Sequence, residues 1–150
     1  MKIVYMDYAS SSPVDPRVSQ AMLPYFTESI GNPSSIHQIG AEAREAIEVA
    51  RRQVAGLIKA EKPQEVIFTS GATESTNMAL KGVLRRNSDK GKHMVTTTIE
   101  HMSVLNTAKY LTTGGFDVTF VPVDSYGYVD PQRIAEAMKK ETTLVSVTYA

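Results

Sequence analysis

Cysteine and tryptophan are both absent from this 150-residue sequence, and neither sign of charge is in excess, because 16 Lys and Arg balance 16 Asp and Glu. The lack of cysteine excludes disulfides, a thiolate metal cage and a thiol nucleophile on this chain. A formal net charge of zero removes the electrostatic footprint with which proteins usually bind nucleic acid or anionic membranes. We therefore expect neither nucleic acid nor a membrane among the partners.

Long apolar runs and metal-ligand patterns are also missing. No run approaches the roughly 20 apolar residues of a membrane-spanning helix, and the chain reaches Asp7 too early for a secretory signal. The three histidines share no metal-ligand spacing with one another or with nearby carboxylates. The sequence thus predicts a cytoplasmic protein without a metal site.

The second half of the chain alternates strand-like and helix-like segments. Runs rich in β-branched residues predict strands at 66–69, 94–99, 118–123 and 144–149. The segments between them predict helices at about 72–86, 103–113 and 131–140. Because the strands are β-branched on both faces, the pattern favours an α/β fold in which helices cover both faces of a mainly parallel sheet.

Two helices are predicted before the first strand. Asp15 and Pro16 are typical of a helix start. The helix that begins there spans about 16–28 and is expected to bury Val18, Met22, and Tyr25 or Phe26. After a break at 31–35, a longer helix is predicted over 39–59, with an apolar face formed by Ala43, Ile47, Ala50, Val54, Leu57 and Ile58. The charged face opposite is expected to be solvated and to carry a few ion pairs.

Residues 68–77 (Phe-Thr-Ser-Gly-Ala-Thr-Glu-Ser-Thr-Asn) directly follow a predicted strand and open a predicted helix. Gly71 permits a tight turn there, and the free N–H groups of 72–74 with the helix dipole make an anion site that suits a phosphate. The alternative is a plain helix cap, in which Ser70 or Thr73 satisfies the backbone donors and nothing is bound. The segment is neither a Walker loop nor a dinucleotide fingerprint.

His101 comes just after the strand predicted at 94–99, so a parallel sheet places it on the same rim as residues 71–73. An imidazole there can act as an acid or base, or stack on a flat cofactor. The alternative is a surface loop histidine or a helix-cap partner. His93 precedes the strand, at the end away from this rim, and is expected at the surface, whereas His37 follows the 31–35 loop and can face a site.

The last predicted strand runs to the end of the chain, and no helix follows it. In an open α/β sheet, ligands bind beyond the carboxyl ends of the strands. A half-covered sheet would also expose apolar faces and an unpaired edge. We therefore expect these residues to be the amino-terminal part of a larger protein.

Four segments resemble, in order and spacing, the motifs of the cysteine desulfurases, in the branch related to the nitrogenase and iron–sulfur cluster assembly enzymes. They are residues 6–15, 31–37, 68–77 and 98–101. The resemblance covers essentially the whole chain. The Gly-Asn-Pro-Ser-Ser-Ile-His sequence of 31–37 favours this branch over the sulfur-mobilisation and selenocysteine-lyase branch.

The resemblance implies an enzyme that uses pyridoxal phosphate, has the aspartate-aminotransferase-like fold and is usually a homodimer. Such an enzyme takes the sulfur from L-cysteine, leaves L-alanine, and passes the sulfur on as a persulfide for iron–sulfur cluster or thio-cofactor assembly. An iron–sulfur scaffold protein is then an expected partner. Residues 1–150 would be an amino-terminal segment and the first part of the large, cofactor-binding domain, with the remainder absent.

The resemblance also implies roles for individual residues. Ala72 and Thr73, beside Gly71, would hold the cofactor phosphate, and His101 would stack on the pyridine ring and take part in proton transfers as a catalytic residue. Residues that would line the substrate entrance are Ala9, Ser10, Asn32 and His37.

The family's Schiff-base lysine and persulfide cysteine have no counterpart in these 150 residues, nor do the Asp and Gln that hold the ring or the arginine for the substrate carboxylate. Without these groups most of the protein's contribution to the cofactor chemistry is missing, so this chain alone is expected to be inactive. Two alternatives stay open. One is another pyridoxal-phosphate lyase or aminotransferase of the same superfamily, and the other is a non-catalytic scaffold protein derived from the fold.

Overall fold

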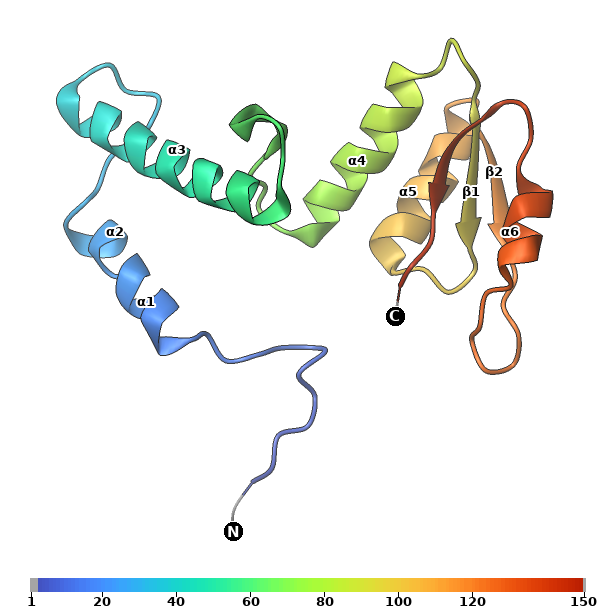
Figure 1. The fold of residues 1–150 in the computed structure, drawn as a ribbon, viewed down its shortest axis with the longest axis horizontal. Helices are drawn as coiled ribbons and strands as arrows, with labels where there is room; N and C mark the ends of the chain where they lie inside the picture. Colours follow the sequence, from blue (N-terminus) through green and yellow to red (C-terminus); the bar gives the residue numbers. More distant parts are fainter. Residues whose placement is uncertain (1–2, 150) are drawn as a thin grey trace. The chain divides into compact units, whose positions relative to one another are not determined.

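Three parallel strands form a sheet in this computed structural model, which describes residues 3–149 (Figure 1). The central strand β1 (His93–Thr97) pairs with β2 (Asp117–Val121) on one side and with β3 (Thr142–Ser146) on the other. All five residues of β1 are buried. The predicted parallel sheet is confirmed, although each strand begins one or two residues earlier than its sequence pattern indicates and ends two or three residues sooner.

Helices cover both faces of this sheet, as predicted. Helix α4 (Ala72–Arg86) leads into β1, α5 (Met102–Thr113) joins β1 to β2, and α6 (Pro131–Ala137) joins β2 to β3. Since β2 and β3 flank β1 on opposite sides, right-handed crossovers place α5 and α6 on opposite faces. The core lies under α4 and α5, where Leu80, Leu84, Met94 and Leu111 pack together. The edge of the sheet where the strands end, after Thr97, Val121 and Ser146, is called here the carboxyl rim.

The chain divides into two compact units, Met1–Ile67 and Phe68–Ala150, and the sheet belongs to the second. The first unit holds α1 (Pro16–Met22), α2 (Pro24–Thr27), α3 (Gln38–Ile58) and the short 3-10 helix η1 (Pro63–Glu65). The single helix expected over 16–28 is therefore wrong. Pro24 has no backbone N–H to donate, so one helix ends at Met22 and another begins at Pro24.

The apolar faces predicted in the first unit are only partly covered. Contrary to the prediction, the first two helices leave Val18, Met22, Tyr25 and Phe26 exposed. On α3 the predicted face is half-buried at Ala43, Ile47, Ala50 and Val54 but exposed at Leu57 and Ile58. Helical spacing correctly predicts which residues share a face, but it does not show how far a neighbouring element extends over that face.

The strand expected at 66–69 is not formed, and this segment pairs with no strand in the described part of the chain. The backbone groups of Val66 are already used, because its N–H donates to the Pro63 carbonyl at 3.0 Å and its carbonyl accepts from the Arg51 guanidinium. A strand is defined by its ladder, so β-branched composition alone was not sufficient to predict one here.

His93 contradicts the expectation of a surface histidine, since it is 1% exposed at the start of β1. Its Nδ1 lies 2.7 Å from Thr142 Oγ1 in β3, and its Nε2 lies 2.9 Å from Thr119 Oγ1 in β2. Thr142 Oγ1 also accepts the Lys139 N–H at 2.7 Å, which leaves the Thr142 hydroxyl hydrogen to donate to the imidazole. The neutral ring thus ties all three strands together at their amino ends.

The environment of His93 lowers its pKa, first through burial and then through the nearby Lys139 charge, while Asp117 and Glu141 oppose this shift. The unfolded chain therefore binds a proton more readily than the folded chain does. The resulting contribution to stability is present above the unfolded value of about 6.5 and is lost as pH falls through the lower folded value.

Replacing His93 should therefore make stability less dependent on pH. Chemical denaturation of His93→Gln between pH 7.5 and 5 is expected to give a flatter fall in unfolding free energy than that of the unmodified chain. If the unfolding free energy falls as steeply with pH in His93→Gln as in the unmodified chain, His93 is not the source of this pH dependence.

Candidate cofactor site

The amino end of α4 presents the backbone donors that the sequence predicts. In the described residues no side chain caps this helix, and the first N–H that bonds to the turn is that of Ser75, to the Gly71 carbonyl. The N–H groups of 72–74 thus remain available, and the Thr73 hydroxyl has no hydrogen-bond partner within residues 3–149. The plain cap through Ser70 or Thr73 is therefore not observed in the described residues, and the phosphate site stays a prediction.

Glu74 does not occupy these donors, although it lies in the first turn. Its carboxylate accepts both the hydroxyl and the backbone N–H of Ser70, each at 2.7 Å. Both hydrogen bonds hold the Glu74 pKa below its usual value, and the bond from the Ser70 hydroxyl has the larger effect. The carboxylate is therefore directed to the residue before the helix, and the N–H groups of 72–74 still face outward from the helix end.

The turn at Gly71 does not require the conformational freedom of glycine. Its φ of 164° is ordinary extended backbone, so the turn does not need a left-handed residue. A Cβ added at Gly71 would meet nothing within 4 Å, so the space beside the helix end is open. Three backbone donors, one hydroxyl and this open space fit a phosphate group.

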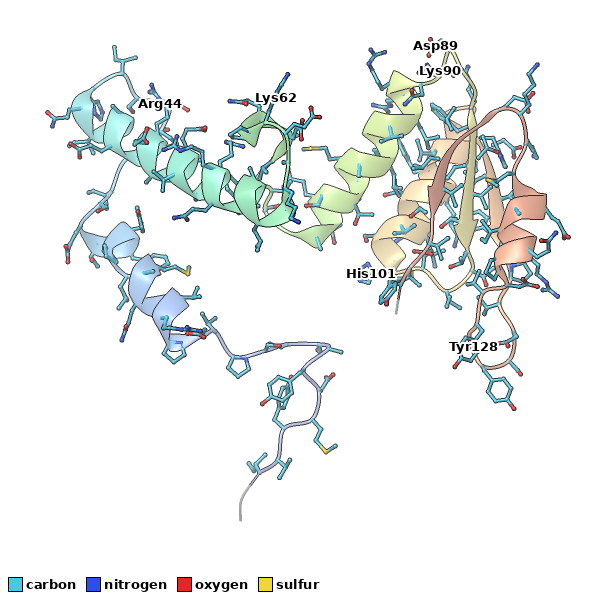
Figure 2. The ribbon with its side chains drawn as sticks, viewed as in Figure 1. Arg44, Lys62, Asp89, Lys90, His101 and Tyr128 are labelled. Carbon is cyan, nitrogen blue, oxygen red and sulfur yellow. The ribbon has the colours of Figure 1, made fainter. Side chains whose placement is uncertain are left out.

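His101 is the N-cap of α5, on the carboxyl rim (Figure 2). Figure 2 shows His101 and Tyr128 at one end of the second unit and Asp89 and Lys90 at the other. The His101 Nδ1 accepts the Ser103 N–H at 3.1 Å and lies 2.8 Å from the Ser103 hydroxyl. Since Nδ1 accepts, the neutral ring carries its proton on Nε2. The cap alternative from the sequence is thus observed, and it orients the ring.

Thr73 and His101 come together in one groove of about 310 Å³ between α4 and α5, called here the cofactor groove. This volume lies at the lower end of the roughly 300–1,000 Å³ that is usual for ligand pockets. Both residues come from the second unit, so the arrangement belongs to one compact body. Gly71 and Ala72 directly precede Thr73 at the helix end.

Several further lining residues were given no role in the sequence analysis, and two on each helix are described here. Asn77 and Lys81 follow Thr73 at spacings of four on α4, and Asn106 and Tyr110 lie on the facing side of α5. The Lys81 Nζ lies 4.7 Å from the centre of the Tyr110 ring, a cation–π contact. The signal that could have found the α4 pair was the polar stripe at 73, 77 and 81.

The residues predicted at the substrate entrance lie in the first unit. Ala9 and Ser10 are exposed in a turn in which the Ser10 N–H bonds to the Asp7 carbonyl at 3.2 Å. Asn32 Oδ1 accepts the Ser34 N–H at 2.9 Å, and His37 Nδ1 caps α3 by accepting the Gly40 N–H at 3.3 Å. These contacts shape the two loops, and the entrance role stays a prediction.

The loop that carries Asn32 and His37 is held firmly against the start of α3. The Arg44 guanidinium donates to the carbonyls of Pro33 at 2.9 Å and Ser35 at 3.0 Å. A Cβ on Gly40 would lie 2.5 Å from the Ser35 carbonyl oxygen, so only glycine allows this approach. The loop conformation is thus set within the first unit.

In comparisons with known families, residues 4–150 match aminotransferase class-V. The chain belongs to this family. Cysteine desulfurase IscS 1 of Archaeoglobus fulgidus is 56% identical over 146 residues, covering 97% of this class-V chain and 38% of that protein. Cysteine desulfurase IscS of Methanosarcina thermophila is 48% identical over 149 residues, covering 99% of the chain and 37% of that protein.

Solved structures give the same result. A NifS-like protein superposes with a TM-score of 0.87 at 42% identity, over 96% of this class-V chain and 39% of its own. The structure of SspA in complex with cysteine superposes with a TM-score of 0.84 at 38% identity, over 95% of this chain and 41% of the SspA chain. The predicted resemblance and fold class are confirmed, and the chain spans well under half the length of these relatives.

No described helix is long and apolar enough to cross a membrane. No group of three or more His, Cys, Asp or Glu is placed to hold a metal ion among the described side chains.

The Ser103 hydroxyl should control the His101 tautomer. Ser103→Ala is expected to raise the fraction of neutral rings that carry the proton on Nδ1, because only the backbone N–H still donates there. Ser103→Thr, which keeps a hydroxyl, is the matched control. Long-range ¹H–¹⁵N spectra at pH 8 report the tautomer, and an unchanged ratio in Ser103→Ala would show that the backbone donor suffices.

Proposed function

We propose that this chain is the amino-terminal part of a cytoplasmic, pyridoxal-phosphate-dependent cysteine desulfurase. In this proposal the complete enzyme converts L-cysteine to L-alanine and passes the sulfur on as a persulfide for iron–sulfur cluster or thio-cofactor assembly. The observation that carries the proposal is the cofactor groove, which unites an open helix end with a histidine. The 56% identity to a cysteine desulfurase adds support for the reaction.

Gly71, Ala72 and Thr73 would hold the cofactor phosphate through backbone N–H groups and the Thr73 hydroxyl. The α4 dipole favours negative charge at this point, and phosphate oxygens are strong acceptors. His101 would lie against the pyridine ring, since it lines the same groove as Thr73. The bound cofactor supplies an electron sink for carbanion chemistry.

His101 would be the acid–base group that this chain contributes from the groove. Ser103 occupies Nδ1, so Nε2 is the atom at which a proton is held or moved. Ala9, Ser10, Asn32 and His37 would line the entrance by which L-cysteine arrives. The Schiff-base lysine and the persulfide cysteine must come from residues outside this sequence, so the isolated chain is proposed to be inactive.

The partners proposed for the complete enzyme are a second copy of itself and an iron–sulfur scaffold protein. Both proposals come from the similarity to cysteine desulfurases. The balanced charge of the chain, 16 basic against 16 acidic residues, gives no reason to add nucleic acid or membrane surfaces to them.

Titration of the 150-residue chain with two ligands should separate the phosphate contact from the ring contact. Inorganic phosphate is expected to shift the amide signals of 71–74 only, whereas pyridoxal phosphate should also shift those of His101 and Ser103. Thr73→Val should weaken both ligands about tenfold, because a hydrogen bond to a charged group contributes about 1.5 kcal/mol.

Thr112→Val is the matched control for this titration, since Thr112 is an exposed threonine on α5 that does not line the groove among the described residues. It should bind both ligands as the unmodified chain does. If Thr73→Val and the unmodified chain bind phosphate and pyridoxal phosphate equally well, Thr73 does not contact the phosphate.

Turnover requires the missing part of the enzyme. Mixed with the carboxyl-terminal part of the Archaeoglobus fulgidus relative, the chain is expected to form alanine and a persulfide from L-cysteine. His101→Ala should then lower kcat at least a hundredfold, the lower end of acid–base contributions, and change KM much less. An unaffected kcat in His101→Ala would show that His101 is not catalytic. Formation of a product without a persulfide would favour another reaction of the superfamily.

A further inference from the structure

Glu100 directly precedes His101 and is 6% exposed, a burial unusual for an acidic side chain. Its Oε1 accepts the Thr97 hydroxyl at 2.8 Å and the Thr148 backbone N–H at 2.7 Å. Thr97 ends β1, and Thr148 follows the end of β3. One carboxyl oxygen therefore joins two neighbouring strands on the carboxyl rim.

The same loop is tied to the other neighbour of β1. The Thr98 N–H donates to the Val121 carbonyl at the end of β2, at 3.0 Å. Residues 98–100 are thus fastened on both sides of the central strand, and His101 is the next residue along. The loop that presents the imidazole is held by contacts across the whole width of the sheet.

The carboxyl group makes this arrangement costly to change. A buried polar group that loses its hydrogen bonds is left unsatisfied away from water, which costs more than an exposed contact would. A movement of residues 98–101 along the rim would pull Glu100 away from Thr97 or Thr148. The His101 position is therefore fixed more firmly than an exposed N-cap would be by itself.

We propose that Glu100 is a positioning residue, which holds His101 at the height on the carboxyl rim where the cofactor ring meets it. The inference rests on the proposed function. Glu100 does not line the cofactor groove among the described residues, so it acts only through His101. Thr97 and Thr148 are its partners in this role.

Three variants of the 150-residue chain test the proposal. Glu100→Ala removes the acceptor, whereas Glu100→Gln keeps an oxygen at Oε1 and should retain both hydrogen bonds. Glu136→Ala is the matched control, because Glu136 is an exposed glutamate on α6 in the same unit.

Amide hydrogen exchange and ligand titration are the two measurements. Glu100→Ala is expected to speed exchange of the Thr148 N–H at least tenfold and to weaken pyridoxal phosphate about tenfold. Its affinity for inorganic phosphate at 71–74 should stay unchanged, which a merely destabilised unit would not allow. Glu100→Gln and Glu136→Ala should match the unmodified chain in the Thr148 exchange rate and in the affinities for both ligands.

Two results would overturn the proposal: unchanged exchange at Thr148 in Glu100→Ala, or faster exchange with unchanged pyridoxal phosphate affinity. If Glu100→Ala does not fold, Thr97→Val, which removes one of the two donors, is judged by the same criteria with smaller expected effects. If the unmodified chain binds no pyridoxal phosphate, the assignment of a cofactor site to this chain alone fails, separately from the role of Glu100. The exchange rates of amides 98–101 then decide whether Glu100 fixes the loop, and unchanged rates in Glu100→Ala show that it does not.

Discussion

Burial of β1 between two parallel neighbours is the constraint on which the rest of the second unit depends. A strand that is covered on both faces and paired on both edges has one register, because a slip would expose apolar residues and break two ladders at once. Buried hydrogen bonds secure it at each end, through His93 at its first position and Glu100 beyond its last. The ends of α4 and α5 are placed relative to this strand by the core that they share with Met94. The cofactor groove is thus a consequence of how one strand is enclosed.

Sequence reasoning succeeded where a local signal and the tertiary structure agree. Helix α4 was predicted with its observed bounds because its polar start and apolar spacing both mark it. Sequence reasoning failed where the structure of a residue depends on contacts with residues distant in the sequence. Residues 66–69 have a strand composition, yet Arg51 and Pro63 take the backbone groups of Val66. His93 looked like a surface residue beside Gly91 and Lys92, but hydroxyl groups from two other strands, distant in sequence, enclose it.

The same distinction applies to the candidate site. The proximity of Thr73 and His101 was predicted, but the expected reason was wrong, because residues 66–69 pair with no described strand. Helix α4 leads into β1 and α5 follows it, so both helices begin at the end of the unit where β1 ends. Glu100 and Ser103 were missed, although both adjoin His101 closely in the sequence. Their contribution is a hydrogen bond of particular geometry, which composition and periodicity do not encode. The first-unit residues Asn32 and His37 stay predictions for the substrate entrance, and their local contacts are those of an Asx turn and a helix cap.

The loop over 31–37 differs from most surface loops in how its order arises. Its carbonyls are bonded to Arg44, and the absence of a side chain at Gly40 lets the backbone approach closely. The conformational entropy of this loop is therefore given up when the first unit folds, and not when something binds to it. Any group that meets Asn32 or His37 meets a preorganised surface, and the association then proceeds without the usual entropic cost of ordering a recognition loop.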